Sequence, residues 1–377
     1  MLEQNKQRLI RITDYTKINE IISYYKNNNI YNDIFNNFID TLEYDPNGIV
    51  IGLIINKYTE EYAFDYIKQY KSTLIFLDCR FNNLIGIPKI PQLTTLICTC
   101  NHIDAIPDSK LLQILYCDYN SFKELPDLPL LQILQCNNNW IQELHGYPLL
   151  TYLDCYGNKL KILSNLPSLK YLNCTYNQLT TIHEFPLLEK LYCSENKLVT
   201  LSNLPLLTYL DCHCNDLIEL PVYPLLLQLE CEENKLVALP EFPVIEKINC
   251  KNNRIRSISN MPLLKKLYID NNQLLEIPPF PALFCLSCDN NNLSSLPAFP
   301  SLLELYCQYN VLESISNMLL LEKLQINCNQ LRSLPAFPSL KYLECRENHF
   351  KEKPQFPSIE YINYGDFYPY ESDEYDE

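Results

Sequence analysis

The sequence predicts a repeat solenoid, in which short coils of equal length stack along one axis. The first observation is an asparagine that recurs every 19 residues, fifteen times without insertion or deletion, from Asn82 to Asn348. The second is the apolar pattern before it: Leu stands five residues earlier in fourteen copies, and Cys stands three residues earlier in thirteen. The third is a proline nine residues after the asparagine in thirteen copies. Self-similarity at a short fixed period indicates stacked units that bury one continuous core.

The unit reads L-x-x-L-x-C-x-x-N-x-L-x-x-[IL]-[PS]-x-[FLMY]-P-x, and residues 188–205 show it plainly as LEKLYCSENKLVTLSNLP. This pattern resembles the leucine-rich repeat family, whose core is L-x-x-L-x-L-x-x-N-x-L with Cys tolerated at the third apolar position. The resemblance covers residues 74 to about 357. It implies a right-handed, curved solenoid with a parallel β-sheet on the concave face and an extended or turn-like convex side. The short, Pro-rich second half resembles the bacterial-type subclass. The residue usage also looks like that of repeat proteins of amoeba-infecting giant viruses.

Within each coil, L-x-x-L-x-C predicts a short strand with Leu and Cys facing inward, because side chains alternate along a strand. Counted from the asparagine, apolar positions −8, −5, −3, +2, +5 and +8 are expected to fill the core. The asparagine is predicted to be structural, since its amide has a donor and an acceptor that can bond the turn of its own coil and that of the next. Prolines at +6 and +9 are expected to keep the convex half extended. Serine at +6, as in Ser202, predicts a local side-chain turn.

The sequence divides into residues 1–72, 73–364 and 365–377. Residues 1–72 lack the repeat and are predicted to be mainly helical, with apolar stripes in 18–25, 34–42 and 62–70 and a turn at 45–48. They are expected to cap the first coil, as solenoids require; an adaptor module similar to an F-box is the other interpretation. Lys353 replaces Ile or Leu at +5, so the unit after it is expected to close the array. The last segment has six acidic residues and no basic one, which predicts a solvated tail.

Composition restricts the class of partner and the compartment. The net charge of −15 and the pI of 4.9 disfavour nucleic acid and anionic membranes. Of seventeen cysteines, thirteen occupy one inward position, and the N-terminal residues lack an apolar run of signal-peptide length, so a reducing cytoplasm is predicted (the host cytoplasm if the protein is viral). No stretch approaches the ~18 apolar residues that span a bilayer.

Chemistry-bearing motifs are absent from the sequence. It has no G-x-G-x-x-G, G-x-S-x-G or H-E-x-x-H pattern, so no catalytic residue, cofactor or metal is predicted and the protein is not expected to be an enzyme. Cys212-His213-Cys214 looks like a fragment of a metal site. However, Cys212 is expected to point inward and Cys214 to lie in the following turn.

The family resemblance implies that a partner binds on outward positions of the strands, at −6, −4, −2 and −1 from the asparagine. The candidate partner-binding residues are Tyr116, Tyr152, Asp154, Tyr171, Tyr192, Tyr209, Asp211, Glu230, Tyr268 and Tyr306. Four of the tyrosines, at positions 152, 171, 192 and 209, come from successive coils and are expected to form one patch. Tyrosine suits an interface because it is large, stiff and polar at its tip; packing between neighbouring strands is the other interpretation.

The predicted function is a non-catalytic protein–protein interaction scaffold with an unidentified protein partner. The alternative is a substrate-receptor subunit of a ubiquitin ligase, with residues 1–72 as an F-box-like adaptor. A glycan or pattern receptor would require a secreted chain.

Overall fold

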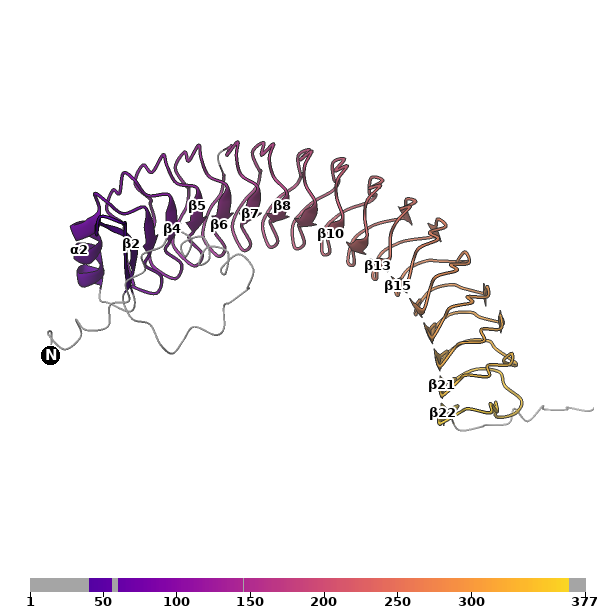
Figure 1. The fold of residues 1–377 in the computed structure, drawn as a ribbon. Helices are drawn as coiled ribbons and strands as arrows, with labels where there is room; N and C mark the ends of the chain where they lie inside the picture. The colour runs from indigo at the N-terminus through magenta and orange to yellow at the C-terminus, as the bar shows by residue number, and fades with distance from the viewer. Residues whose placement is uncertain (1–40, 56–59, 145, 366–377) are drawn as a thin grey trace, which may run out of the picture. The chain divides into compact units, whose positions relative to one another are not determined.

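The computed structural model describes residues 41–55, 60–144 and 146–365 (Figure 1). They belong to two compact units: the first contains the residues up to Leu179 and Phe185–Leu187, and the second contains Thr180–Glu184 and the residues from Leu188 on. Both units are parallel-sheet solenoids built from the same coil. In each unit the strands lie along one side of the stack and the return segments along the other (Figure 1).

In the first unit a hairpin and a helix precede the coils. Strands β1 (Thr41–Tyr44) and β2 (Val50–Ile54) pair antiparallel, and helix α2 (Glu60–Tyr70) connects β2 to the coils. Strand β2 pairs in parallel with the first coil strand, so the hairpin extends the sheet. The coil strands of this unit are β3 (Phe76–Asp78), β4 (Thr95–Ile97), β5 (Ile114–Tyr116), β6 (Ile133–Gln135), β7 (Tyr152–Asp154) and β8 (Tyr171–Asn173).

The second unit continues the same coil pattern. Its main sheet contains β9 (Lys190–Tyr192), β10 (Tyr209–Asp211), β11 (Gln228–Glu230), β13 (Lys247–Asn249), β15 (Lys266–Tyr268), β16 (Cys285–Ser287), β18 (Glu304–Tyr306), β20 (Lys323–Gln325), β21 (Tyr342–Glu344) and β22 (Tyr361–Asn363). Two small parallel sheets lie on the return side, formed by β12 (Ala238–Leu239) with β14 (Ser257–Ile258) and by β17 (Ser295–Leu296) with β19 (Ser314–Ile315). The return side is therefore extended, as expected, and in these two places the residues at +4 and +5 also pair between neighbouring coils.

The described part of the N-terminal segment is only partly helical. The expected turn at 45–48 is present, and α2 covers the expected stripe at 62–70. The stripe expected over 34–42 is wrong where the structure describes it, since Leu42 lies in β1. Its side chain is buried at 4% exposure and pairs opposite Leu53, so strand pairing outweighs helical spacing here. The stripe at 18–25 lies outside the described residues.

Successive coils pair in a constant register of one repeat. Tyr152 lies opposite Tyr171 and Leu210 lies opposite Leu229, for example, so equivalent residues stack in rows along the sheet. The six predicted inward positions are buried. In the coil of Asn234 they range from 0% to 3% exposed and comprise Leu226, Leu229, Cys231, Leu236, Leu239 and Phe242. The cysteine row is buried in every coil that has it, which confirms that these thiols act as small apolar groups.

The asparagines form a hydrogen-bonded ladder between coils. Asn215 Nδ2 donates to the carbonyls of Cys212 at 3.1 Å and Cys193 at 3.0 Å, and its Oδ1 accepts from the Leu198 amide at 2.9 Å. The predicted structural role is therefore confirmed, with the preceding coil rather than the next as the bonded neighbour. For the first coil, Asn82 Nδ2 bonds Ile55 O after β2 at 3.1 Å, so the hairpin replaces a preceding coil.

The residue before each asparagine has left-handed backbone geometry. Its φ lies between 51° and 67° in all fifteen coils, although only Gly157 among them is a glycine. We call these fifteen residues, at position −1, the turn row. This conformation turns the chain from the strand into the core and points the turn-row side chains outward as one series.

Two further expectations concern the return side and the end of the array. Serine at +6 does not form a local turn: the hydroxyls of Ser202 and Ser316 donate to the carbonyls of Ile182 and Leu296 in the preceding coil. Lys353 is exposed, as expected for the closing coil. No helix in the described part of the chain is long and apolar enough to cross a membrane.

Candidate interaction face

All ten candidate residues occupy the first or last position of a coil strand, with side chains directed outward and partly exposed. We call the outward side chains at −6, −4 and −2 the strand face. Tyr116 ends β5, Tyr152 and Asp154 begin and end β7, and Tyr171 begins β8 in the first unit. The remaining six lie on β9, β10, β11, β15 and β18 of the second unit.

The structure brings the four patch tyrosines together as two pairs. The rings of Tyr152 and Tyr171 stack with centroids 4.4 Å apart and 5° between their planes. The rings of Tyr192 and Tyr209 lie 4.8 Å apart at 33°. The first pair belongs to the first unit and the second pair to the second unit. Both spacings follow from the distance between neighbouring strands, about 4.8 Å, so the register of the sheet itself creates the aromatic contacts.

Asp154 lies beside the first tyrosine pair in an unusual environment. Burial raises the pKa of its carboxyl to about 6, against the opposing effect of hydrogen bonds from Asn137, Tyr156 and Asn173. Its Oδ1 atom is buried and has no hydrogen-bond partner within the described residues. Burial also raises the pKa of Tyr116 to about 12 and that of Tyr152 above its usual value. This part of the strand face is thus aromatic and half-buried, and one carboxyl oxygen is enclosed there without a donor.

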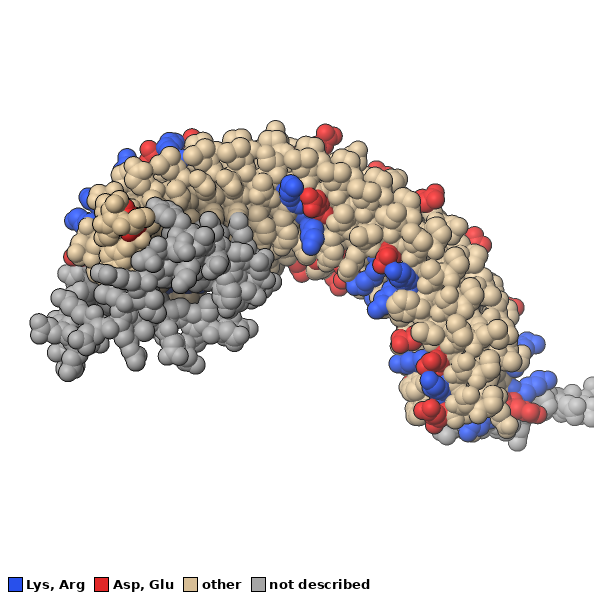
Figure 2. Space-filling view, in the orientation of Figure 1, with Lys and Arg blue, Asp and Glu red and all other residues tan. Residues whose placement is uncertain are grey.

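The acidic candidates of the second unit already have partners. Asp211 Oδ1 lies 2.6 Å from Nδ1 of His213. Glu230 Oε1 lies 2.6 Å from Nζ of Lys247 and accepts from Gln228 Nε2 at 2.7 Å. Figure 2 shows basic and acidic side chains side by side along the strand side of this unit. Lys247 therefore offsets the charge of Glu230, and the His213 ring occupies one carboxylate oxygen of Asp211.

Tyr268 and Tyr306 lie apart from the tyrosine pairs and contact lysines. Nζ of Lys251 is 5.3 Å from the ring centroid of Tyr268. Nζ of Lys323 is 5.0 Å from the ring of Tyr306 and 5.1 Å from that of Tyr342, so it lies between two aromatic faces. Lys323 was not among the predicted site residues. The signal for it was present in the repeat, since it stands at −6 between tyrosines of the two neighbouring coils.

Each 19-residue coil contributes one three-residue parallel strand, one asparagine of the ladder and a Pro-rich return segment. These features define a leucine-rich-repeat solenoid. The chain belongs to the leucine-rich repeat family. It is similar to YopM from Yersinia enterocolitica WA-314, with 30% identity over 84% of this chain and 78% of that chain and a TM-score of 0.73. YopM from Yersinia pestis, a leucine-rich effector protein, shows 29% identity over 81% of this chain and 92% of that chain, with a TM-score of 0.62.

The functional domain of InlJ from Listeria monocytogenes, which includes a cysteine ladder, is similar at 27% identity over 76% of this chain and 70% of that chain, with a TM-score of 0.55. No protein-family model and no curated protein sequence matches the chain.

Proposed function

We propose that the protein is a non-catalytic scaffold that binds a protein partner on its strand face. The observation that carries this proposal is the stacked pair Tyr152 and Tyr171, at 4.4 Å and 5°. Each ring is held by its neighbour before any partner arrives, so binding costs little side-chain entropy. Partly exposed, rigid aromatic side chains are typical of the residues that dominate interface energies.

Charge and cysteine content indicate the class of partner and the compartment. The net charge of −15 favours proteins over nucleic acids or anionic membranes as partners. The seventeen free cysteines favour a reducing compartment, so we place the scaffold in the cytoplasm, or in the host cytoplasm if the protein is viral.

One local arrangement invites an enzymatic interpretation, because Asp211, His213 and Cys214 stand close together in sequence. The Cys214 thiol, however, donates to Oε2 of Glu233 at 3.3 Å. Burial, followed by the carboxylates of Glu233 and Glu195, raises the pKa of this thiol to about 12. Since the thiolate is the nucleophile in cysteine catalysis, this environment opposes that chemistry.

The test removes the aromatic pairs and leaves the core intact. One variant carries Tyr152→Ala and Tyr171→Ala, and a second carries Tyr192→Ala and Tyr209→Ala. A control replaces four exposed apolar residues away from the strand face by Thr, namely Ile162, Val199, Ile218 and Val237. Loss of interface aromatics costs about 2 kcal/mol or more per hot-spot residue, so capture of native partners should fall more than about tenfold in at least one tyrosine variant. The circular dichroism spectra of both tyrosine variants should match that of the parent, and the control variant should capture partners as well as the parent does. Undiminished capture by both tyrosine variants would exclude the strand face.

The alternative, a ubiquitin-ligase substrate receptor, requires the N-terminal segment to recruit a ligase component. Against it, β2 pairs with β3, and α2 lies between them in sequence, so residues 41–55 and 60–70 are built into the end of the solenoid. Capture should therefore be compared between the intact chain and residues 41–377, which keep this pairing. The scaffold proposal expects the same partners for both. A ligase component that is recovered only with the intact chain would favour the alternative.

A further inference from the structure

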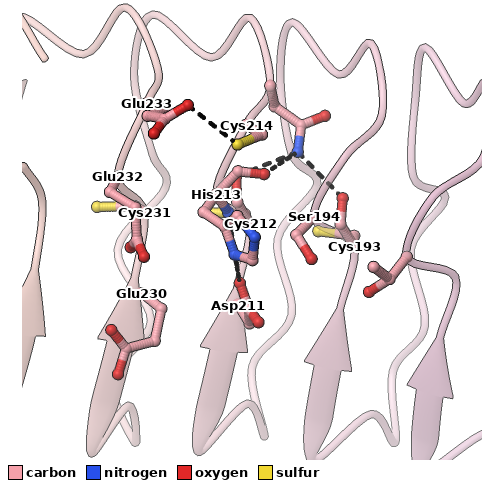
Figure 3. Close-up of polar contacts among 12 residues, drawn as sticks. Cys193, Ser194, Asp211, Cys212, His213, Cys214, Glu230, Cys231, Glu232 and Glu233 are labelled. Carbon is pink, nitrogen blue, oxygen red and sulfur yellow. Dashed lines mark hydrogen bonds and ion pairs between the residues drawn. The ribbon is translucent and has the colours of Figure 1, made fainter. Parts of the chain in front are cut away.

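A cluster of metal-binding side chain types lies beside the strand face of the second unit. Glu195, His213 and Cys214 each bring one ligand atom to within 4.8 Å of the others. His213 and Cys214 follow β10 directly, as Figure 3 shows, and Glu195 occupies the turn-row position of the preceding coil, 19 residues before Cys214. Glu195 is exposed and the other two are partly exposed, so a dissolved ion can reach all three.

The orientation of His213 gives a second, independent indication. Its Nδ1 lies 2.6 Å from Oδ1 of Asp211, the last residue of β10 (Figure 3). Histidines that bind metals commonly give one ring N–H to a carboxylate, which fixes the tautomer and makes the other nitrogen the ligand. In His213 this leaves Nε2 as the nitrogen that would bind the metal.

We propose that Glu195, His213 and Cys214 bind a zinc ion through one carboxylate oxygen, one imidazole nitrogen and one thiolate sulfur. A mixed S, N and O set suits zinc, a borderline-soft ion that accepts all three donors in tetrahedral geometry. Tetrahedral zinc bonds of about 2.0–2.3 Å place donor atoms roughly 3.3–3.8 Å apart. The three side chains would therefore draw closer by about 1 Å on binding, which partly exposed side chains accommodate by rotation. Water fills the fourth position.

Binding exchanges a proton for the metal. The Cys214 thiol now donates to Oε2 of Glu233 at 3.3 Å. On binding, the sulfur loses this proton to solvent and forms the bond to zinc as a thiolate, with no change in oxidation state. The metal supplies the positive charge that the sulfur needs among the carboxylates of Glu195 and Glu233.

The chain contains a matched comparison site. Cys328 occupies the same turn-row position in another coil, and its thiol donates to Oε2 of Glu347 at 3.3 Å. Where the first site has Glu195 and His213, this one has Tyr309 and Asn327. Among the described residues, only the first site assembles three such ligand atoms. Cys328 thus separates the effect of the complete ligand set from that of a turn-row thiol beside a glutamate.

The test titrates the full chain, freed of metals and kept reduced, with Zn²⁺ by calorimetry and with Co²⁺ by absorption spectroscopy. The expected result is one Zn²⁺ per chain and a sulfur-to-cobalt charge-transfer band. Cys214→Ser should abolish the band, and His213→Ala and Glu195→Gln should each weaken Zn²⁺ binding by at least tenfold. Asp211→Asn should weaken it about 10–100-fold, as expected for a residue that orients a ligand. Cys328→Ser should change neither measurement.

Two kinds of result would overturn the proposal. The first is an absence of Zn²⁺ binding, or of the cobalt band, in the parent chain. The second is an unchanged stoichiometry and affinity in Cys214→Ser and His213→Ala, or a band lost in Cys328→Ser. Circular dichroism verifies that each variant folds. If another variant does not fold, Glu195→Gln still tests the proposal, because Glu195 is exposed and its replacement leaves the core unchanged.

Discussion

Replacement of Asn158 by leucine tests the asparagine ladder in a coil that lies next to the single tryptophan of the chain, Trp140. Asn158 is 3% exposed, and its Nδ2 donates to the carbonyls of Cys136 at 2.9 Å and Cys155 at 3.1 Å. Its Oδ1 accepts from the buried amide of Ile141 at 3.0 Å. Leucine fills a similar volume and removes all of these bonds, so the variant isolates the polar contribution of the side chain.

The ladder geometry determines the size of the effect. The carbonyl of Cys136 keeps a bond from Asn139 at 3.1 Å, and that of Cys155 keeps one from Asn177 at 3.0 Å. The Ile141 amide has no such second partner within the described residues. One orphaned buried amide costs about 1–3 kcal/mol, and the carbonyls add less because each stays bonded. We therefore expect a loss of about 1–3 kcal/mol rather than the larger cost of several orphaned groups.

The assay uses the single tryptophan of the chain, Trp140, as a local probe. It precedes Ile141, and Nζ of Lys159 lies 5.6 Å from its ring centroid. Thermal unfolding followed by Trp140 fluorescence should shift to lower temperature in Asn158→Leu. A local probe is needed because solenoids can unfold in parts. Asn310→Leu removes the equivalent bonds in the second unit and shows how far a distant defect affects this region. It should shift the midpoint of the Trp140 melting curve less than Asn158→Leu does. If the Trp140 melting curve of Asn158→Leu superimposes on that of the parent, the ladder does not stabilise the fold as argued.

Two further predictions follow from burial. The raised pKa of Asp154, about 6, means that folding favours its protonated form, so its contribution is retained below the unfolded pKa near 4 and lost as pH rises through 6. The stability of Asp154→Asn relative to the parent should therefore increase as the pH rises from 4 to 7, by up to about 3 kcal/mol; a stability difference independent of pH would contradict this. In the native, metal-free protein, only Cys100, Cys214 and Cys328 are partly exposed, while the other fourteen cysteines are buried. A thiol reagent should thus label three cysteines in the native state and seventeen after denaturation, and rapid labelling of more than three would contradict the inward cysteine row.

Strict repetition made the solenoid predictable from sequence. Because every coil has 19 residues, the inward rows, the asparagine ladder and the parallel register follow from one coil applied to its neighbours. The N-terminal segment lacked this redundancy: Leu42 suited a helical stripe and a strand alike, and pairing with Leu53 decided between them. Serine at +6 was expected to form a local bond, yet the hydroxyl of Ser202 donates to the Ile182 carbonyl, because stacking brings this carbonyl of the preceding coil within hydrogen-bond distance.

The candidate site shows the same division between sequence and structure. The repeat placed the tyrosines on the outward side of the strands, but ring contacts depend on the actual spacing and tilt of neighbouring strands, which pair Tyr152 with Tyr171. Likewise, Glu230 looks like a free acid in sequence, and the side chain of Lys247 from the next coil neutralises it.

The sequence by itself determined the coil, its inward residues and the amide that ties each bend, because these depend on contacts that recur at every repeat. Only the tertiary structure decided which outward side chains meet, as it did for Glu195 with His213 and Cys214. Those contacts join residues of different coils through particular rotamers, which no periodic pattern specifies.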